Sequence, residues 1–384
     1  MLLKLIALAI AGLSGAAFAQ SNVTISGNLD MGYYSQSMQT ATIMDTRTAA
    51  AANGSSTSTW RITGEEALGG GMKAGFQLEN DLAAGASSTS GIMAGQSFLS
   101  LSGNWGSLKA GNVNTAGLTA GTTAQPFGTA IGGGYSGAFA RLSRAGVNGT
   151  GSVAAGNSTT SVQAEGEVVG GVAGTAGISG TRTVRMNSSL MYATPSFSGF
   201  SATLQYVAKN SDSNVAVTGN TGGFTGLGLN YNNGPLNIAY ANEQFSSGAG
   251  LAGAAPTGGN GVLLAANEKV THNLLAANYT WGPATVYGGW TSSKSSVAAT
   301  ADSRSWNLAL KYAVSGALSL MANVVKVDDK LIGNQDRSLT GLGLDYALSK
   351  RTTAYGRYEN GDNDKSNGAT GNFSRYQIGM RHTF

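Results

Sequence analysis

The sequence predicts an all-β fold, a transmembrane antiparallel β-barrel of about 16 strands with short periplasmic turns, long external loops and an inward-folded third loop. The first supporting observation is the end of the chain, where residues 374–384 alternate between two faces and stop on Phe384. Chain ends usually fray in water, whereas a tilted strand of roughly 9–11 residues can cross a bilayer. The second observation is a secretory signal at the start of the chain. The third is that the connections between predicted strands alternate between short and long.

The start of the chain is typical of an exported protein. Lys4 precedes an apolar run over 5–13, and small residues lead to Ala17-Phe18-Ala19, a cleavage site of the A-x-A type. We therefore expect residues 1–19 to be a cleaved signal peptide and residues 20–384 to form one barrel domain.

Composition narrows the class further. There is no cysteine, which excludes disulfides and thiolate sites, and charged residues make up only 11% of the chain. After the signal, no apolar run reaches the roughly 18 residues that a membrane helix requires. A secreted all-β protein and an outer-membrane barrel remain. The net charge of +4 is too small to indicate nucleic acid as a partner.

The first elements follow a period of two. A strand is expected over about 22–34, where apolar residues alternate with polar ones that include Asp30. Residues 35–57 are small and polar without an apolar period, so we expect a loop. Two further strands start near Trp60 and Met72 and are joined by a short turn over 67–71.

The same rhythm continues to the end of the chain. Short turns are expected at 103–106, 197–200, 232–235, 281–283 and 315–316, and long Gly/Ser/Thr/Asn loops near 81–96, 208–223, 244–268, 292–303, 327–337 and 360–373. An up-and-down barrel separates its connections by length in this way, whereas a β-sandwich does not. Strand-end aromatic residues fit the interface girdles of such a barrel, although β-propensity alone would also enrich them: Tyr206, Tyr231, Tyr240, Tyr279, Trp281, Trp290, Tyr312 and Tyr346.

The longest connection lies within about 113–184. A barrel of this size is too wide for side chains to fill, so a loop folded inward can narrow it. We expect residues 117–144 to be the inserted part and 145–181 to be an external low-complexity loop.

Charges in and around this connection are mostly positive, since no Asp or Glu occurs from Leu82 through Ala164. Cations at a narrow point favour anions. Arg375 and the acids Asp30, Glu65 and Asp345 also fall on the polar faces. The residues expected to line the pore or its constriction are Arg61, Lys73, Glu79, Lys109, Arg141, Arg144, Arg185, Lys311, Arg357 and Arg381. The alternative is that these charges lie at different depths and are simply solvated.

The most informative stretches are the closing Gly379-Met380-Arg381-His382-Thr383-Phe384, the opening 21–24 with Gly27, Asp30 and Gly32, the segment 68–79, and a set of residues between 185 and 200. Together they resemble the general porins of Gram-negative bacteria, especially the trimeric, sixteen-stranded porins typical of β-proteobacteria. The resemblance implies a homotrimer, a third loop folded into the lumen, and a Phe384 that the barrel-assembly machinery reads. It also implies a channel for small hydrophilic solutes and ions, surrounded by outer-membrane lipid and lipopolysaccharide, with no cofactor.

The sequence also departs from that family. Thr59 and Gly111-Asn112 stand where an arginine is usual, and Ala67 stands where Asp is usual. The third loop lacks the carboxylates that many porins place there. The expected anion preference is therefore weak.

Other functions have less support. A hydrolase needs a proton-shuttling histidine, and His272 and His382 have no nucleophile motif such as G-x-S-x-G nearby. Calcium binding at Asp328-Asp329 or at Asp362 and Asp364 is another alternative, although such pairs are usually solvated loop charge. An outer-membrane adhesin and a solute-specific channel remain as alternatives to a general pore.

Overall fold

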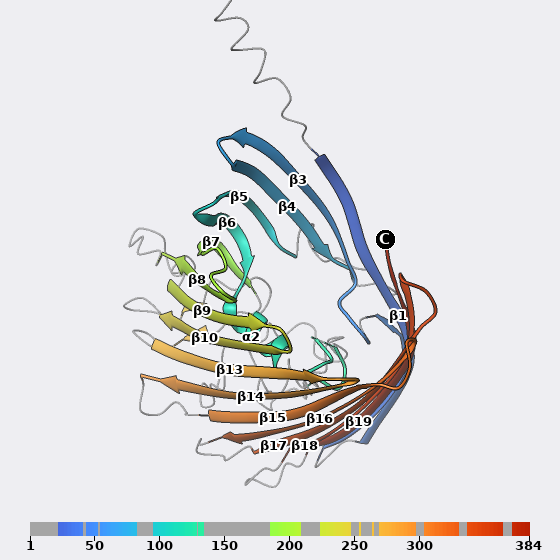
Figure 1. The fold of residues 1–384 in the computed structure, drawn as a ribbon. Coiled ribbons are helices and arrows are strands. Elements are labelled where there is room, and N and C mark those ends of the chain that lie inside the picture. Colours follow the sequence, from blue (N-terminus) through green and yellow to red (C-terminus); the bar gives the residue numbers. More distant parts are fainter. Residues whose placement is uncertain are drawn as a thin grey trace, which may run out of the picture.

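The computed structural model describes residues 22–40, 44–52, 54–82, 95–128, 130–133, 185–208, 223–246, 253–254, 263–264, 269–296, 303–329, 336–363 and 371–384. Most of these residues belong to one antiparallel sheet that closes into a barrel, with the helix α2 (Ala116–Thr123) on its inner side (Figure 1). Over these ranges no helix has the length and apolar character needed to cross a bilayer.

The strands of the barrel wall follow one another in chain order. They are β1 (Asn22–Thr40), β2 (Met44–Ala52), β3 (Thr59–Gly69), β4 (Met72–Asp81), β5 (Ser97–Gly103), β6 (Gly106–Asn114), β7 (Arg185–Ala193), β8 (Phe200–Val207), β9 (Gly223–Asn233), β10 (Leu236–Ser246), β13 (Lys269–Trp281), β14 (Ala284–Ser295), β15 (Ser303–Ala313), β16 (Leu318–Asp329), β17 (Arg337–Ala347), β18 (Thr352–Asn363) and β19 (Gly371–Thr383). A separate two-stranded sheet contains β11 (Gly253–Ala254) and β12 (Leu263–Leu264).

The barrel has 16 wall positions, because β2 and β3 share one. β3 pairs with the first part of β1, from Asn22 to Asn28, and β2 pairs with the part from Met31 to Gln39. On its other edge β1 pairs with β19, from Asn28↔Thr383 to Thr40↔Gly371. The predicted closure of the first strand against the last is therefore confirmed.

One sequence expectation is wrong. Residues 35–57 are not a loop throughout, since β1 continues to Thr40 and β2 occupies Met44–Ala52. These two segments form a hairpin from small and polar residues. A hairpin can satisfy its backbone hydrogen bonds without presenting a continuous apolar face. The absence of an apolar period over residues 35–57 therefore does not indicate a loop.

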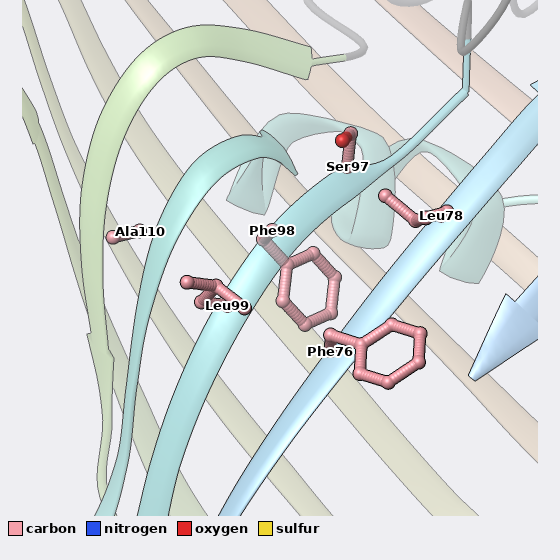
Figure 2. A pocket seen from close by; sticks show the side chains of 6 residues that line it. All are labelled: Phe76, Leu78, Ser97, Phe98, Leu99 and Ala110. Atoms are coloured by element: carbon pink, nitrogen blue, oxygen red, sulfur yellow. The ribbon is translucent and has the colours of Figure 1, made fainter. Parts of the chain in front are cut away.

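Side chains alternate between two faces of the wall. On β15, Trp306, Leu308 and Leu310 are exposed on the outer face, while Ser305 and Asn307 are buried on the inner face. Exposed large apolar side chains occur on the outer face of most of the described strands, as lipid contact requires. A shallow hollow of about 320 Å³ on strands β4, β5 and β6 is lined by such side chains, including Phe76 and Leu99 (Figure 2).

The connections separate by length, as predicted. Short turns lie at 70–71, 104–105, 194–199, 234–235, 282–283, 314–317 and 348–351, and we call this end of the barrel the short-turn rim. The long connections leave from the opposite ends of the strands. Several strands extend further into the expected loops than predicted, for example β16 to Asp329 and β18 to Asn363.

Candidate functional site: the inner wall and the third loop

The third loop enters the barrel directly after β6. The Thr115 hydroxyl accepts a hydrogen bond from the Leu118 N–H at 3.3 Å and so caps α2. This helix contacts β9, β10 and β13 on their inner faces (Figure 1). The inserted segment is consequently fixed to the wall from its first turn.

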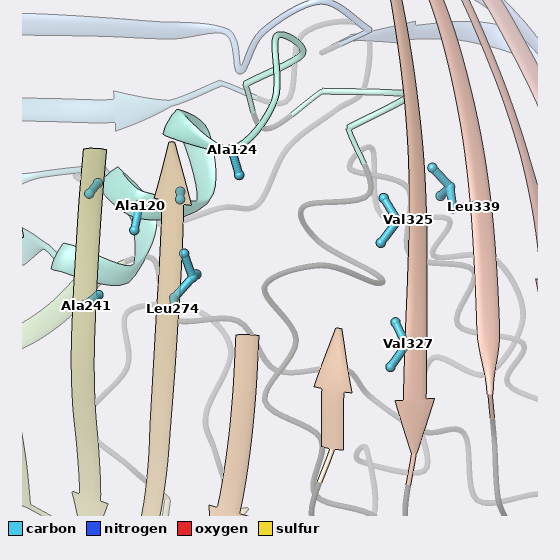
Figure 3. Close-up of a cluster of buried hydrophobic side chains, with 9 residues drawn as sticks. Ala120, Ala124, Ala241, Leu274, Val325, Val327 and Leu339 are labelled. Carbon is cyan, nitrogen blue, oxygen red and sulfur yellow. The ribbon is translucent and has the colours of Figure 1, made fainter. Parts of the chain in front are cut away.

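Small side chains let the helix approach the wall closely. Ala120 and Ala124 are fully buried against Ala241 and Leu274, within a cluster that extends to Val325, Val327 and Leu339 (Figure 3). At Gly228 a Cβ atom would overlap the methyl group of Ala116. The apolar inner residues of these strands therefore serve to seat the loop.

Three asparagine side chains of the wall donate hydrogen bonds to main-chain carbonyls of the loop. Asn278 on β13 donates to Thr123 O at 3.0 Å, and Asn307 on β15 donates to Ala124 O at 2.7 Å. Asn323 on β16 donates to Gly132 O and Gly133 O at 3.1 and 2.9 Å. The loop segment 115–133 therefore runs along the inner wall from strand to strand.

Two buried carboxylates accept hydrogen bonds from loop N–H groups. Glu243 on β10 accepts from Gly117 N and Glu359 on β18 accepts from Gly132 N, both at 2.7 Å. The other oxygen of Glu359 pairs with Arg375 at 2.5 Å. Our sequence reasoning did not select these wall residues. The alternation of faces could have found them, because Glu243 shares its face with Ala239 and Ala241, and Glu359 shares its face with Arg357.

Several of the predicted pore-lining residues are engaged in ion pairs on the inner faces of β3, β4 and β7. Arg61 lies 3.6 Å from Glu79, and Lys73 lies 2.6 Å from Glu65. Arg185 contacts Asp81 at 2.8 Å and Glu79 at 3.5 Å. Their charges are thus compensated locally.

A polar network occupies the inner wall where the barrel closes. Asp30 is fully buried and accepts hydrogen bonds from Ser55 N, Ser56 N and the Tyr355 hydroxyl at 2.6–2.7 Å. Arg357 pairs with Asp345 at 2.7 Å and also donates to the Ser55 hydroxyl at 3.1 Å. The segment 54–58 between β2 and β3 therefore lies folded against β1 and β18.

Three predicted residues have no carboxylate within salt-bridge distance among the described side chains. Lys109 lies over the Phe98 ring at 4.6 Å, and Arg381 donates to the Ser55 hydroxyl at 3.3 Å. Lys311 shares the inner face of β15 with Asn307. Arg141 and Arg144 lie outside the described residues, as do the signal peptide and the end of the constriction loop. The main chain of Phe384 pairs with Gly27 beside the closing strand.

The two histidines are both bonded to hydroxyl groups. His272 Nδ1 lies 2.7 Å from the Ser293 hydroxyl, and His382 Nδ1 lies 2.9 Å from the Thr352 hydroxyl. In the described ranges no group of three or more His, Cys, Asp or Glu residues is arranged to hold a metal ion. Asp362 and Asp364, considered for calcium, have no described side-chain placement.

Comparison with known proteins gives a consistent result. A family model described as Gram-negative porin matches residues 5–366. The chain is 28% identical to outer membrane porin protein 32 of Delftia acidovorans over 356 residues, covering 92% of this chain and 87% of that protein. It is 27% identical to an outer membrane porin protein of Bordetella pertussis over 425 residues, covering 98% of this chain and 97% of that protein.

Solved structures share the fold. The anion-selective porin from Comamonas acidovorans superimposes with a TM-score of 0.69 at 24% identity, covering 95% of this chain and all of that one. The trimer form of OmpT from Vibrio cholerae gives a TM-score of 0.61 at 15% identity, covering 95% and 99% of the two chains.

Proposed function

Because the chain belongs to the Gram-negative porin family and forms an outer-membrane channel, we propose that it passes small hydrophilic solutes and ions by passive diffusion with a weak preference for anions. A water-filled lumen narrowed by the third loop sieves solutes by size, and fixed charge biases the ions. No cofactor, energy source or catalytic group takes part.

The observation that carries the anion preference is the pairing of charges on the inner wall. Five of the inner-face cations, Arg61, Lys73, Arg185, Arg357 and Arg375, are ion-paired. Two further acids, Asp30 and Glu243, are fully buried and accept hydrogen bonds from main-chain N–H groups, so a passing ion cannot contact their carboxylates directly.

Among the described side chains of the inner face, the cations that remain are Lys109, Lys311 and Arg381, and all three are partly exposed. The accessible fixed charge on the described inner wall is therefore positive, which lowers the barrier for anions. The relative from Comamonas acidovorans is described as anion-selective, which agrees with this proposal. Arg141 and Arg144 would add to the same bias if they line the constriction.

We also propose the assembly that this family implies. The chain would be exported with residues 1–19 removed, inserted by the barrel-assembly machinery through its closing strand, and assembled as a homotrimer within outer-membrane lipid and lipopolysaccharide. Under this proposal each protomer carries its own pore.

Single-channel recording of the purified protein in a planar bilayer under a KCl gradient tests these proposals together. We expect current steps in multiples of three and a reversal potential of the sign that chloride preference gives. A folded protein without conductance would contradict the channel function. A reversal potential of the opposite sign would contradict only the anion preference.

A further inference from the structure

The three inner-face cations without a carboxylate partner among the described residues lie at the same end of the barrel. Lys109 is the third residue after Gly106, the start of β6, and Lys311 is two residues before Ala313, the end of β15. Arg381 is two residues before Thr383, the end of β19. Each of these strand ends adjoins the short-turn rim, so all three charges are near this mouth of the pore.

The same cations are spread around the circumference. Counting β2 and β3 as one wall position, β6 is fifth, β15 is twelfth and β19 is sixteenth in the closed order. The intervals between them are therefore seven, four and five positions. Lys109 and Lys311 lie on nearly opposite walls, with Arg381 between them, so the three charges surround the lumen.

Among the described side chains near this rim, cations outnumber acids. Arg381 is opposite Asp30 in the strand register and the two charges attract each other, but the Asp30 carboxylate is buried and hydrogen-bonded to Ser55, Ser56 and Tyr355 rather than to Arg381. The other inner-face acids near this rim are Glu65, which pairs with Lys73, and Asp345, which pairs with Arg357. Lys350 and Arg351 are exposed in the adjoining short turn.

Further along the pore, the described groups offer little accessible charge. The loop segment 115–133 contains no charged residue. The side chains of Arg357 and Arg375 are only 2% and 4% exposed and are held by carboxylates. Among the described side chains, the accessible positive charge is therefore concentrated at the short-turn mouth.

We propose that Lys109, Lys311 and Arg381 form a cation ring that draws small anions, such as chloride, phosphate and short carboxylates, into the pore from the short-turn side. This inference rests on the proposed anion preference and assigns it to one mouth of the channel. Fixed charges at a mouth raise the local concentration of counter-ions. Salt screens them over about 10 Å at 0.1 M and about 3 Å at 1 M. The selectivity should therefore depend on which side holds the dilute salt.

The test is a reversal potential measured twice on one inserted channel, with a tenfold KCl gradient applied first in one direction and then in the other. We expect two unequal magnitudes for the parent protein, with the stronger anion preference when dilute salt bathes the short-turn mouth. The variant Lys109→Gln/Lys311→Gln/Arg381→Gln should give equal magnitudes and a chloride-to-potassium permeability ratio close to unity.

A matched control removes cations from the outer face near the opposite rim. Lys294 and Lys326 are exposed there, so Lys294→Gln/Lys326→Gln should leave both reversal potentials unchanged. The single variants Lys109→Gln and Lys311→Gln should each give part of the full shift, and they test the ring even if the triple variant fails to fold.

A folded, conducting triple variant with the parent's reversal potentials would overturn the ring while leaving the channel function intact. Equal magnitudes in the parent protein would overturn the assignment to one mouth. A parent protein that folds but does not conduct would overturn both this inference and the proposed function.

Discussion

The ring of Phe384 lies against the main chain of Gly27, where the end of the chain meets the first strand. The two residues also exchange both main-chain hydrogen bonds, each at 3.0 Å. A Cβ atom at position 27 would overlap the Phe384 ring and the carbonyl oxygen of Thr59. Closure of the barrel therefore depends on a glycine at position 27 near the start of the chain and on the aromatic ring of Phe384 at its end.

Replacing Gly27 with valine should reduce the yield of closed barrel, because the added side chain displaces the Phe384 ring and crowds Thr59. Deleting Phe384 should have the same effect. Heat-modifiable migration on a gel measures the folded fraction. The control is Gly356→Val on β18, the strand that pairs with β19, because a Cβ atom at this position meets open space. Normal yields for both Gly27→Val and the deletion would show that this contact is dispensable.

Replacing Asp30 with alanine should destabilise the closure region. The change leaves the Ser55 and Ser56 N–H groups and the Tyr355 hydroxyl without their acceptor in a buried site. Each buried unsatisfied group costs about 1–3 kcal/mol. The temperature at which the folded form is lost should fall clearly in Asp30→Ala. It should fall less in Asp30→Asn, because the asparagine side chain keeps one acceptor oxygen. An alanine variant as stable as the parent protein would contradict this role.

The fold was predictable because the outward side chains of a strand in contact with lipid must be apolar. Residues such as Trp306, Leu308 and Leu310 must face lipid, so a period of two identifies both the strand and its inner face. The same rule failed for residues 35–57, where β1 and β2 pair with each other and their sequence has no apolar period. Backbone pairing alone leaves little trace in a sequence of small and polar residues.

Removing two of the loop anchors should loosen the third loop. In Asn307→Ala/Asn323→Ala the carbonyls of Ala124, Gly132 and Gly133 lose their side-chain donors. At about 1 kcal/mol for each of two anchors, the population of a displaced loop should rise roughly thirtyfold. Open-channel current noise reports this motion. Asn242→Ala is the control, because its amide donates to Asn273 on the neighbouring wall strand. Unchanged noise in the double variant would mean that the remaining contacts hold the loop.

Changing Arg141 and Arg144 to glutamate tests the remaining part of the constriction prediction. If these residues line the pore, reversing two charges should move the reversal potential toward cation preference. The same measurement on Lys109→Glu provides a scale for one reversed charge at the mouth. An unchanged potential in the arginine variant would place both residues outside the constriction.

The candidate site was only half predictable. The period of two placed Arg357, Arg375 and Arg381 on the inner face, because faces follow from the strand pattern. It could not show that Arg375 is neutralised by Glu359, or that Glu359 also holds Gly132 of the third loop, 227 residues away. Pairing across the barrel depends on where the loop lies, and loop position leaves no periodic signal.

The Arg375–Glu359 pair provides the sharpest test of how this loop is held. Arg375→Gln alone leaves the Glu359 carboxylate nearly fully buried without its counter-charge, a change that typically costs about 3–5 kcal/mol. We expect a clear loss of thermal stability and a shift of the reversal potential toward cations. In Arg375→Gln/Glu359→Gln the neutral amide can still accept from Gly132 N, so stability and selectivity should both recover most of their parental values. A double variant as impaired as the single one would mean that the ion pair itself, rather than the avoidance of an unpaired buried charge, fixes the loop.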